Sequence, residues 1–143
     1  MHEVLVIGGG PAGLTAAMFS RMRKMSVLVL DAGRLGGQLV SLYGDKPVHD
    51  WPGYTHVIAG ELARSLIDHA LEVGVEMVGQ RKVLDLVRGG AAPFEVVATD
   101  PLTGAEHRYP TQAVIVAIGA GAFEPRRLKV PGEEELSERF LTY

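Results

Sequence analysis

The stretch Val4-Leu5-Val6-Ile7-Gly8-Gly9-Gly10-Pro11-Ala12-Gly13 decides the fold that this sequence predicts. Its four apolar residues, 4–7, are typical of a buried strand, and they run directly into a glycine-rich turn. A helical stretch follows from about Pro11 to Met25, and a second apolar strand covers Val27–Leu30. This order of strand, turn, helix and strand predicts a βαβ unit with two parallel strands.

The turn fits the pattern G-x-G-x-x-G of dinucleotide-binding proteins, with Gly8, Gly10 and Gly13 as its glycines. The first glycine of that pattern permits a tight bend, the second lets a pyrophosphate approach the backbone, and the third lets helix and strand pack closely. Asp31 ends the second strand, where a carboxylate accepts hydrogen bonds from ribose hydroxyls and repels a 2′-phosphate. The pattern predicts a site for FAD or NAD rather than NADP.

The rest of the chain predicts further helices and strands around this unit. Residues 34–57 lack convincing periodicity and predict a long binding loop, whereas Ile58 to Val73 has the pattern of an amphipathic helix. Predicted strands follow at Val75–Val78, then at Lys82–Val87, Phe94–Ala98 and Glu106–Tyr109 as an antiparallel meander, and at Ala113–Ile118 as a buried parallel strand. The predicted fold class is α/β, a Rossmann-like parallel sheet with helices on its faces plus a small antiparallel β-meander.

Composition excludes several classes of function. The formal net charge is -3 and no long basic run occurs, so nucleic acid and an anionic membrane surface are disfavoured as partners. The opening apolar stretch is too short for a signal peptide, and we expect a cytoplasmic protein. The sequence has no cysteine, and its five histidines show no metal-ligand spacing, so no metal site is predicted.

A second group of candidate residues lies in the long loop. Gly37, Gln38 and Leu39 follow Asp31 closely, so the loop backbone could run beside an extended cofactor while the amide of Gln38 donates and accepts hydrogen bonds. Tyr43 and Asp50 could flank a flavin ring. A flexible surface turn, with the aromatic residues partly in the core and the charges solvated, explains the same residues equally well or better.

Taken together, these residues resemble the thioredoxin-reductase-like class of pyridine nucleotide-disulfide oxidoreductase flavoproteins over essentially the whole chain. Two segments, GGQLVSLYGDKPVHDWPGY at 36–54 and GAFEPRRL at 121–128, resemble the ferredoxin–NADP reductases of that type. The resemblance implies a parent enzyme that passes electrons from NADPH through FAD to ferredoxin or flavodoxin. It also implies a homodimer, and it leaves the catalytic residues unknown.

The resemblance also implies where the cofactor contacts fall. Tyr43 would lie against the isoalloxazine, the backbone of Val83 would meet the adenine, and Phe123 would pack near the flavin. The sequence departs from the class at Asp31, where many relatives have Glu, and at Ile118, where much of the class has Thr. The expected cofactor-binding residues are Gly8, Gly10, Pro11, Ala12, Gly13, Asp31, Gly37, Gln38, Leu39, Tyr43, Asp50, Val83, Ala117, Gly119 and Phe123.

In this class an NADPH-binding domain interrupts the FAD-binding domain. We therefore expect residues 1–118 to be the N-terminal portion of a split FAD-binding domain and residues 119–143 to be a linker or the start of a missing NADPH-binding domain. NADPH would bind only to the full-length parent, and the 143-residue chain alone should be inactive. Three alternatives stay open: the FAD part of a thioredoxin reductase, a short non-catalytic FAD-binding module, and a cofactor-free chain that self-associates through uncovered sheet edges.

Overall fold

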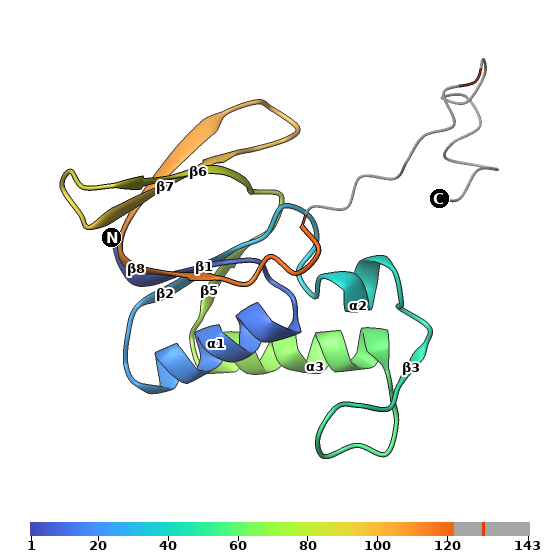
Figure 1. The fold of residues 1–143 in the computed structure, drawn as a ribbon. Helices are drawn as coiled ribbons and strands as arrows, with labels where there is room; N and C mark the ends of the chain where they lie inside the picture. Colours follow the sequence, from blue (N-terminus) through green and yellow to red (C-terminus); the bar gives the residue numbers. More distant parts are fainter. Residues whose placement is uncertain (122–129, 131–143) are drawn as a thin grey trace.

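The computed structural model describes residues 1–121 and residue 130, and its secondary structure confirms the α/β class (Figure 1). Two helices of more than ten residues and a six-stranded sheet dominate these residues. The elements are β1 (His2–Ile7), α1 (Pro11–Met22), β2 (Val27–Leu30), α2 (Gln38–Ser41), β3 (Pro47–Val48), β4 (Val57–Ile58), α3 (Ala59–Glu72), β5 (Glu76–Val78), β6 (Lys82–Arg88), β7 (Phe94–Thr99) and β8 (Glu106–Val116).

The large sheet has the strand order β5-β2-β1-β8-β7-β6 and contains both kinds of pairing. β1 pairs in parallel with β2 on one side and with β8 on the other, and β2 pairs in parallel with β5. β6, β7 and the first half of β8 form an antiparallel meander. The parallel sheet and the meander predicted from the sequence are therefore both present, and β8 belongs to each.

The change from antiparallel to parallel pairing takes place at Thr111 in β8. Thr111 lies opposite Phe94 of β7 and opposite His2 of β1. Its fully buried side chain lies with Oγ1 2.9 Å from the carbonyl oxygen of His2 and 3.2 Å from that of Ala113. This hydroxyl satisfies backbone acceptors at the point where the strand leaves one partner for another.

The parallel sheet is covered on both faces, as its continuous apolar strands predict. On one face, Val6 and Val29 pack with Leu14 and Ala17 of α1 and with Leu62 of α3. On the other face the meander covers the sheet, and its buried core consists of Leu5, Leu28, Leu30, Val96 and Ala98. The result is three layers, with both longer helices on one side of the sheet and the meander on the other (Figure 1).

The structure differs from the sequence prediction in the loop and at one helix end. Residues 34–57, expected to be irregular, contain α2 and the strand β3, which pairs with β4 in a short antiparallel ladder. α1 ends at Met22 rather than near Met25 because the backbone turns left-handed at Lys24, where φ is 66°. The predicted strands 106–109 and 113–118 are parts of one element, β8 with its continuation.

Candidate functional site

The candidate site lies along one edge of the parallel sheet, where the carboxyl ends of β1, β2 and β8 meet. The loops that follow these strands are fixed to the edge by backbone hydrogen bonds. The Gly8 N–H donates to the Leu30 carbonyl over 2.7 Å, and the Ala117 N–H donates to the Ile7 carbonyl over 2.8 Å. Three of the sequence-predicted segments, beginning at Gly8, Asp31 and Ala117, are thus held side by side.

Helix α1 starts directly above this edge because Gly13 allows close packing. A Cβ at Gly13 would lie 1.8 Å from the carbonyl oxygen of Gly8, a distance that no side chain can occupy. The third glycine of the turn therefore has the packing role expected from the sequence. The close approach brings the amino end of α1 to the ends of the strands.

The Asp31 carboxylate holds the glycine-rich turn and its own loop together. Its Oδ2 accepts a hydrogen bond from the Gly9 N–H at 2.7 Å, and its Oδ1 accepts one from the Gly33 N–H at 2.8 Å. The Gly36 N–H donates to the Gly9 carbonyl at 2.8 Å, which adds a second tie between the same loops. A carboxylate can accept about four hydrogen bonds, so Asp31 keeps acceptor capacity for a ligand.

Gly10 and Gly37 face each other across a narrow space at this edge. A Cβ at Gly37 would be 2.9 Å from the Gly10 Cα. A Cβ at Gly10 would meet, among the described residues, only the Gly37 Cα at 3.9 Å. Gly10 therefore has room for a side chain, and its φ of -78° is one that any residue adopts. Neither packing nor backbone conformation requires a glycine there. The bare backbone at Gly10 leaves space for a ligand.

The amino end of α1 is suited to an anion. Gly10 is its N-cap residue, Pro11 occupies the first turn, and the first turn contains no acidic residue. No side chain of the described residues caps the helix, so the orphan N–H groups and the positive end of the helix dipole stay available. Ala12 is exposed and too small to cover them. Backbone N–H groups at a helix start of this kind can bind a diphosphate.

Gln38 and Gly119 extend the same edge. Gln38 is exposed at the start of α2, and its Nε2 would be 3.9 Å from a Cβ at Gly119. The structure therefore brings together eight of the sequence-predicted residues: Gly8, Gly10, Gly13, Asp31, Gly37, Gln38, Ala117 and Gly119.

Two residues predicted in the long loop are exposed, and a third packs in the core. The Tyr43 side chain is 41% exposed, and Lys46 Nζ lies 5.1 Å from the centre of its ring. Asp50 is exposed between β3 and β4. Leu39 is half-buried against the helix-side core, as is Trp51, which agrees with the core interpretation of part of this loop.

Val83 and Phe123 complete the predicted set. Val83 lies on β6 opposite Ala98 and packs against the meander-side core. It stands two residues after Arg81, whose N–H donates to the Asp31 carbonyl at 2.8 Å, so the meander begins beside the ribose-binding candidate. Phe123 lies outside the described residues.

Two contributors to the site were not predicted from the sequence. Gly33 binds the Asp31 carboxylate, and Arg81 ties the start of β6 to the loop after β2. The glycines at 33 and 79 signalled turns, but the pairing of two turns about 50 residues apart has no signature in a single sequence. The described residues contain no group of three or more acidic, histidine or cysteine side chains that could hold a metal ion, and no helix among them could cross a membrane.

Comparison with known proteins gives one family and two groups of relatives. Residues 2–143 match the model of a family described as pyridine nucleotide-disulphide oxidoreductase. Ferredoxin–NADP reductase 2 of Listeria welshimeri is 34% identical over 144 residues, which cover 100% of this chain and 42% of that protein. The ferredoxin–NADP reductase of Metallosphaera sedula is 39% identical over 143 residues, which cover 99% of this chain and 42% of that protein.

Several solved structures with the same fold are named thioredoxin reductases. The one from Lactococcus lactis superposes with a TM-score of 0.68 at 28% identity, over 97% of this chain and 41% of that one. The one from T. acidophilum has a TM-score of 0.71 at 24% identity and covers 94% of this chain and 40% of that one. At this identity the likeness shows the fold alone. The chain spans less than half the length of the relatives it matches.

Proposed function

Because the chain belongs to the pyridine nucleotide-disulphide oxidoreductase family, we propose that residues 1–118 are the N-terminal portion of a split FAD-binding domain. The observation that carries this proposal is the bare backbone of Gly10, which has room for a side chain, at the uncapped start of α1. In this proposal residues 119–143 lead toward an NADPH-binding domain. FAD, when bound, supplies two-electron and one-electron redox chemistry.

The residues of this chain would bind and orient that cofactor. Backbone N–H groups at the start of α1 would hold the pyrophosphate beside Gly10, and the remaining acceptor capacity of Asp31 would meet the ribose hydroxyls. The exposed amide of Gln38 and the exposed ring of Tyr43 would contact the flavin end, with Asp50, Leu39 and Phe123 as further candidates. Val83 would offer backbone groups to the adenine, and Pro11, Ala12, Ala117 and Gly119 would line the same edge.

For the longer protein we propose electron transfer from NADPH through FAD to ferredoxin or flavodoxin. The support is the name that relatives of 34% and 39% identity share over nearly the whole of this chain. We also propose that the longer protein is a cytoplasmic homodimer, as the family resemblance implies. NADPH would bind outside the residues described here.

A second candidate is the FAD part of a thioredoxin reductase, which the 28% identity to the Lactococcus lactis structure supports. The two candidates are distinguished by sequence downstream of Tyr143 in the gene. A C-x-x-C motif in an adjoining nucleotide-binding domain would favour the thioredoxin reductase, because such a motif is the active dithiol of those enzymes. Its absence from that domain would favour the ferredoxin reductase.

The first test is a visible absorption spectrum of the 143-residue chain after mixing with FAD and removing unbound flavin. We expect a bound flavin band near the concentration of the protein, and we expect that band to stay oxidised when NADPH is added without oxygen. Loss of the band on adding NADPH would contradict the placement of the NADPH site outside this chain. A chain that retains no FAD would contradict the proposal that these residues bind the cofactor.

A further inference from the structure

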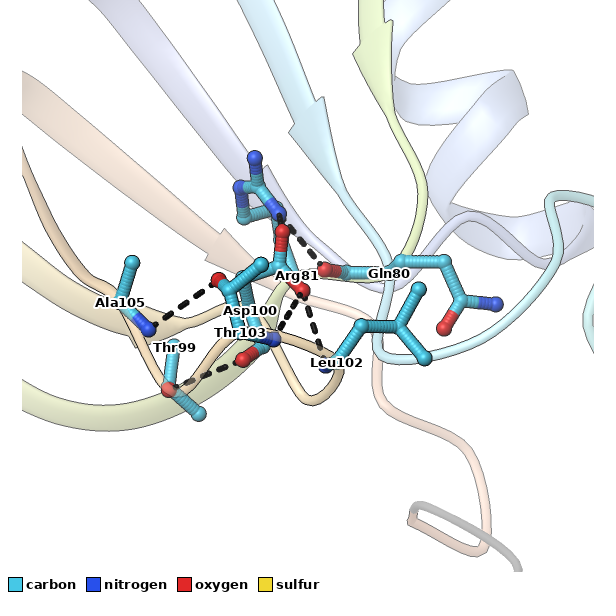
Figure 2. Close-up of polar contacts among 7 residues, drawn as sticks. All are labelled: Gln80, Arg81, Thr99, Asp100, Leu102, Thr103 and Ala105. Atoms are coloured by element: carbon cyan, nitrogen blue, oxygen red, sulfur yellow. Dashed lines mark hydrogen bonds and ion pairs between the residues drawn. The ribbon is translucent and has the colours of Figure 1, made fainter.

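A partly buried arginine joins separate segments of the chain beside the proposed nucleotide site (Figure 2). Arg81 Nη1 donates to Asp100 Oδ2 at 2.8 Å and to the Gln80 carbonyl at 2.9 Å. The side chains of Arg81 and Asp100 are only 18% and 19% exposed. Tyr109 and Asp100 beside the guanidinium raise the pKa of Arg81, which favours the charged guanidinium next to the Asp100 carboxylate.

The acidic partner of Arg81 is itself held firmly by a turn between β7 and β8. Asp100 Oδ1 accepts hydrogen bonds from the N–H groups of Leu102 at 2.9 Å and Thr103 at 3.4 Å (Figure 2). Its own N–H donates to the Ala105 carbonyl at 2.9 Å. The guanidinium is therefore bound to a carboxylate whose position the turn already determines.

The backbone around Arg81 is attached to the loop after β2. The Arg81 N–H donates to the Asp31 carbonyl at 2.8 Å, and the Gln80 N–H donates to the Gly33 carbonyl at 3.0 Å. Gln80 has a φ of 54°, a left-handed conformation that costs free energy in any residue but glycine and persists only where neighbouring contacts impose it. The segment 80–83 is thus held between the meander turn and the Asp31 loop.

The arrangement is costly if its purpose is stability alone. Arg81 Nε is buried and has no hydrogen-bond partner among the described residues, and burial of an incompletely paired ion is unfavourable. A guanidinium is instead suited to fixing a position, because its planar donors are directional.

We infer that Arg81 is a positioning residue for the adenosine half of the bound dinucleotide, acting by holding segment 80–83 beside Asp31. The inference rests on the proposed function, in which Val83 faces the adenine and Asp31 the ribose. Arg81 itself need not touch the ligand. The glycine-rich turn has its own ties, from Gly9 to Asp31 and from Gly36 to Gly9, so the pyrophosphate end should not depend on Arg81.

The test compares Arg81→Met with Arg108→Met in the 143-residue chain. Arg108 is a matched control because it also bridges acids on the meander, Glu95 and Glu106, each at 2.8 Å, but is 56% exposed and pairs away from Asp31. We expect R81M to weaken binding of FAD and of ADP about tenfold, because segment 80–83 must then be ordered when the ligand binds, while binding of inorganic pyrophosphate stays unchanged. R108M should leave all three unchanged.

Amide hydrogen exchange without ligand gives an independent readout. In R81M the backbone amides at positions 80, 81 and 102 should exchange faster than in the wild-type chain, whereas those of Gly9 and Gly36 should keep their rates. Arg81→Lys should partly restore both protection and ADP binding, because a single nitrogen, Nη1, donates to both Gln80 and Asp100 and an ammonium can replace it. This conservative variant also serves if R81M folds poorly.

The outcomes separate the inference from the function on which it rests. Equal losses for ADP and pyrophosphate in R81M, or unchanged ADP binding in a folded R81M, would overturn the positioning role while FAD binding by the wild-type chain stands. A wild-type chain that binds neither FAD nor ADP would overturn the proposed function and this inference with it.

Discussion

At the scale of single residues, the glycine-rich turn contains glycines required for different reasons. Gly13 is needed by the fold, because any side chain there would meet the Gly8 carbonyl. Gly10 has room for a Cβ among the described residues, so packing does not require a glycine there, and in the proposed function its bare backbone faces the pyrophosphate. A sequence pattern alone presents the two as equivalent.

This difference predicts opposite results for two alanine substitutions. Gly13→Ala should lower the free energy of unfolding by about 3 kcal/mol or more, because the helix must move away from β1. Gly10→Ala should unfold at the wild-type urea concentration yet bind FAD about tenfold more weakly or worse, because its methyl group fills the space for the pyrophosphate.

Urea unfolding and titration with FAD measure the two effects. Gly44→Ala is a control for both, since its Cβ would make ordinary contact at 3.6 Å and the site lies in the loop after α2. A G10A chain that binds FAD as tightly as wild type would contradict the role given to that open backbone.

At the scale of elements, strands of strong apolar character were predictable and short or interrupted ones were not. β1 and β2 are continuous apolar runs that can be buried on both faces, so their positions follow from composition. α2 has four residues and β3 has two, which is too short for a hydrophobic periodicity to be recognised in the sequence. β8 was predicted as two strands because Pro110 and the polar residues beside it interrupt its pattern.

The structure shows why a proline is accepted inside β8. A strand tolerates proline where one side has no ladder partner, and residues up to Pro110 pair with β7 alone. Pairing with β1 begins at the next residue, Thr111. Similarly, the Asp31 edge was predictable because parallel strands end together, whereas the Arg81–Asp100 pair joins turns whose proximity depends on the meander.

Thr111→Val tests the importance of this crossing point. Valine has nearly the same shape, so the main loss is the hydroxyl beside the His2 carbonyl, and we expect the free energy of unfolding to fall by about 1–2 kcal/mol. Thr111→Ser keeps the hydroxyl and removes only a methyl group. Any fall in its free energy of unfolding should therefore come from lost packing rather than from a lost hydrogen bond. A urea midpoint for T111V equal to wild type would mean that the buried hydroxyl contributes nothing net.

At the scale of the whole molecule, stability in acid depends in part on Asp100, which pairs with Arg81 between the turn after β7 and the start of β6. The amide of Leu102, the Arg81 guanidinium and the amide of Thr103 hold the pKa of Asp100 below its ordinary value of 3.8. A carboxyl that is more acidic in the folded than in the unfolded chain stabilises the fold above the unfolded pKa, and this contribution is lost as pH falls through the folded pKa.

Asp100→Asn removes that titration but keeps an oxygen for the turn. The stability difference between wild type and D100N should be constant near neutral pH and should shrink when pH falls below the ordinary carboxyl value of 3.8. Urea unfolding of both chains across that range measures it. A difference that does not change with pH would contradict a lowered pKa of Asp100 in the folded chain.

The shared strand β8 also determines how this molecule can assemble during synthesis. β1 leaves the ribosome well before β8, yet β8 is its partner on one side, with Thr111 lying opposite His2, 109 residues earlier in the chain. Contacts so distant along the chain form slowly, because the entropy of a long loop is lost before the favourable contacts between the strands are made. The nascent protein therefore exposes one unpaired edge of a largely apolar strand until β8 has been translated, and chaperone binding would matter most during this interval.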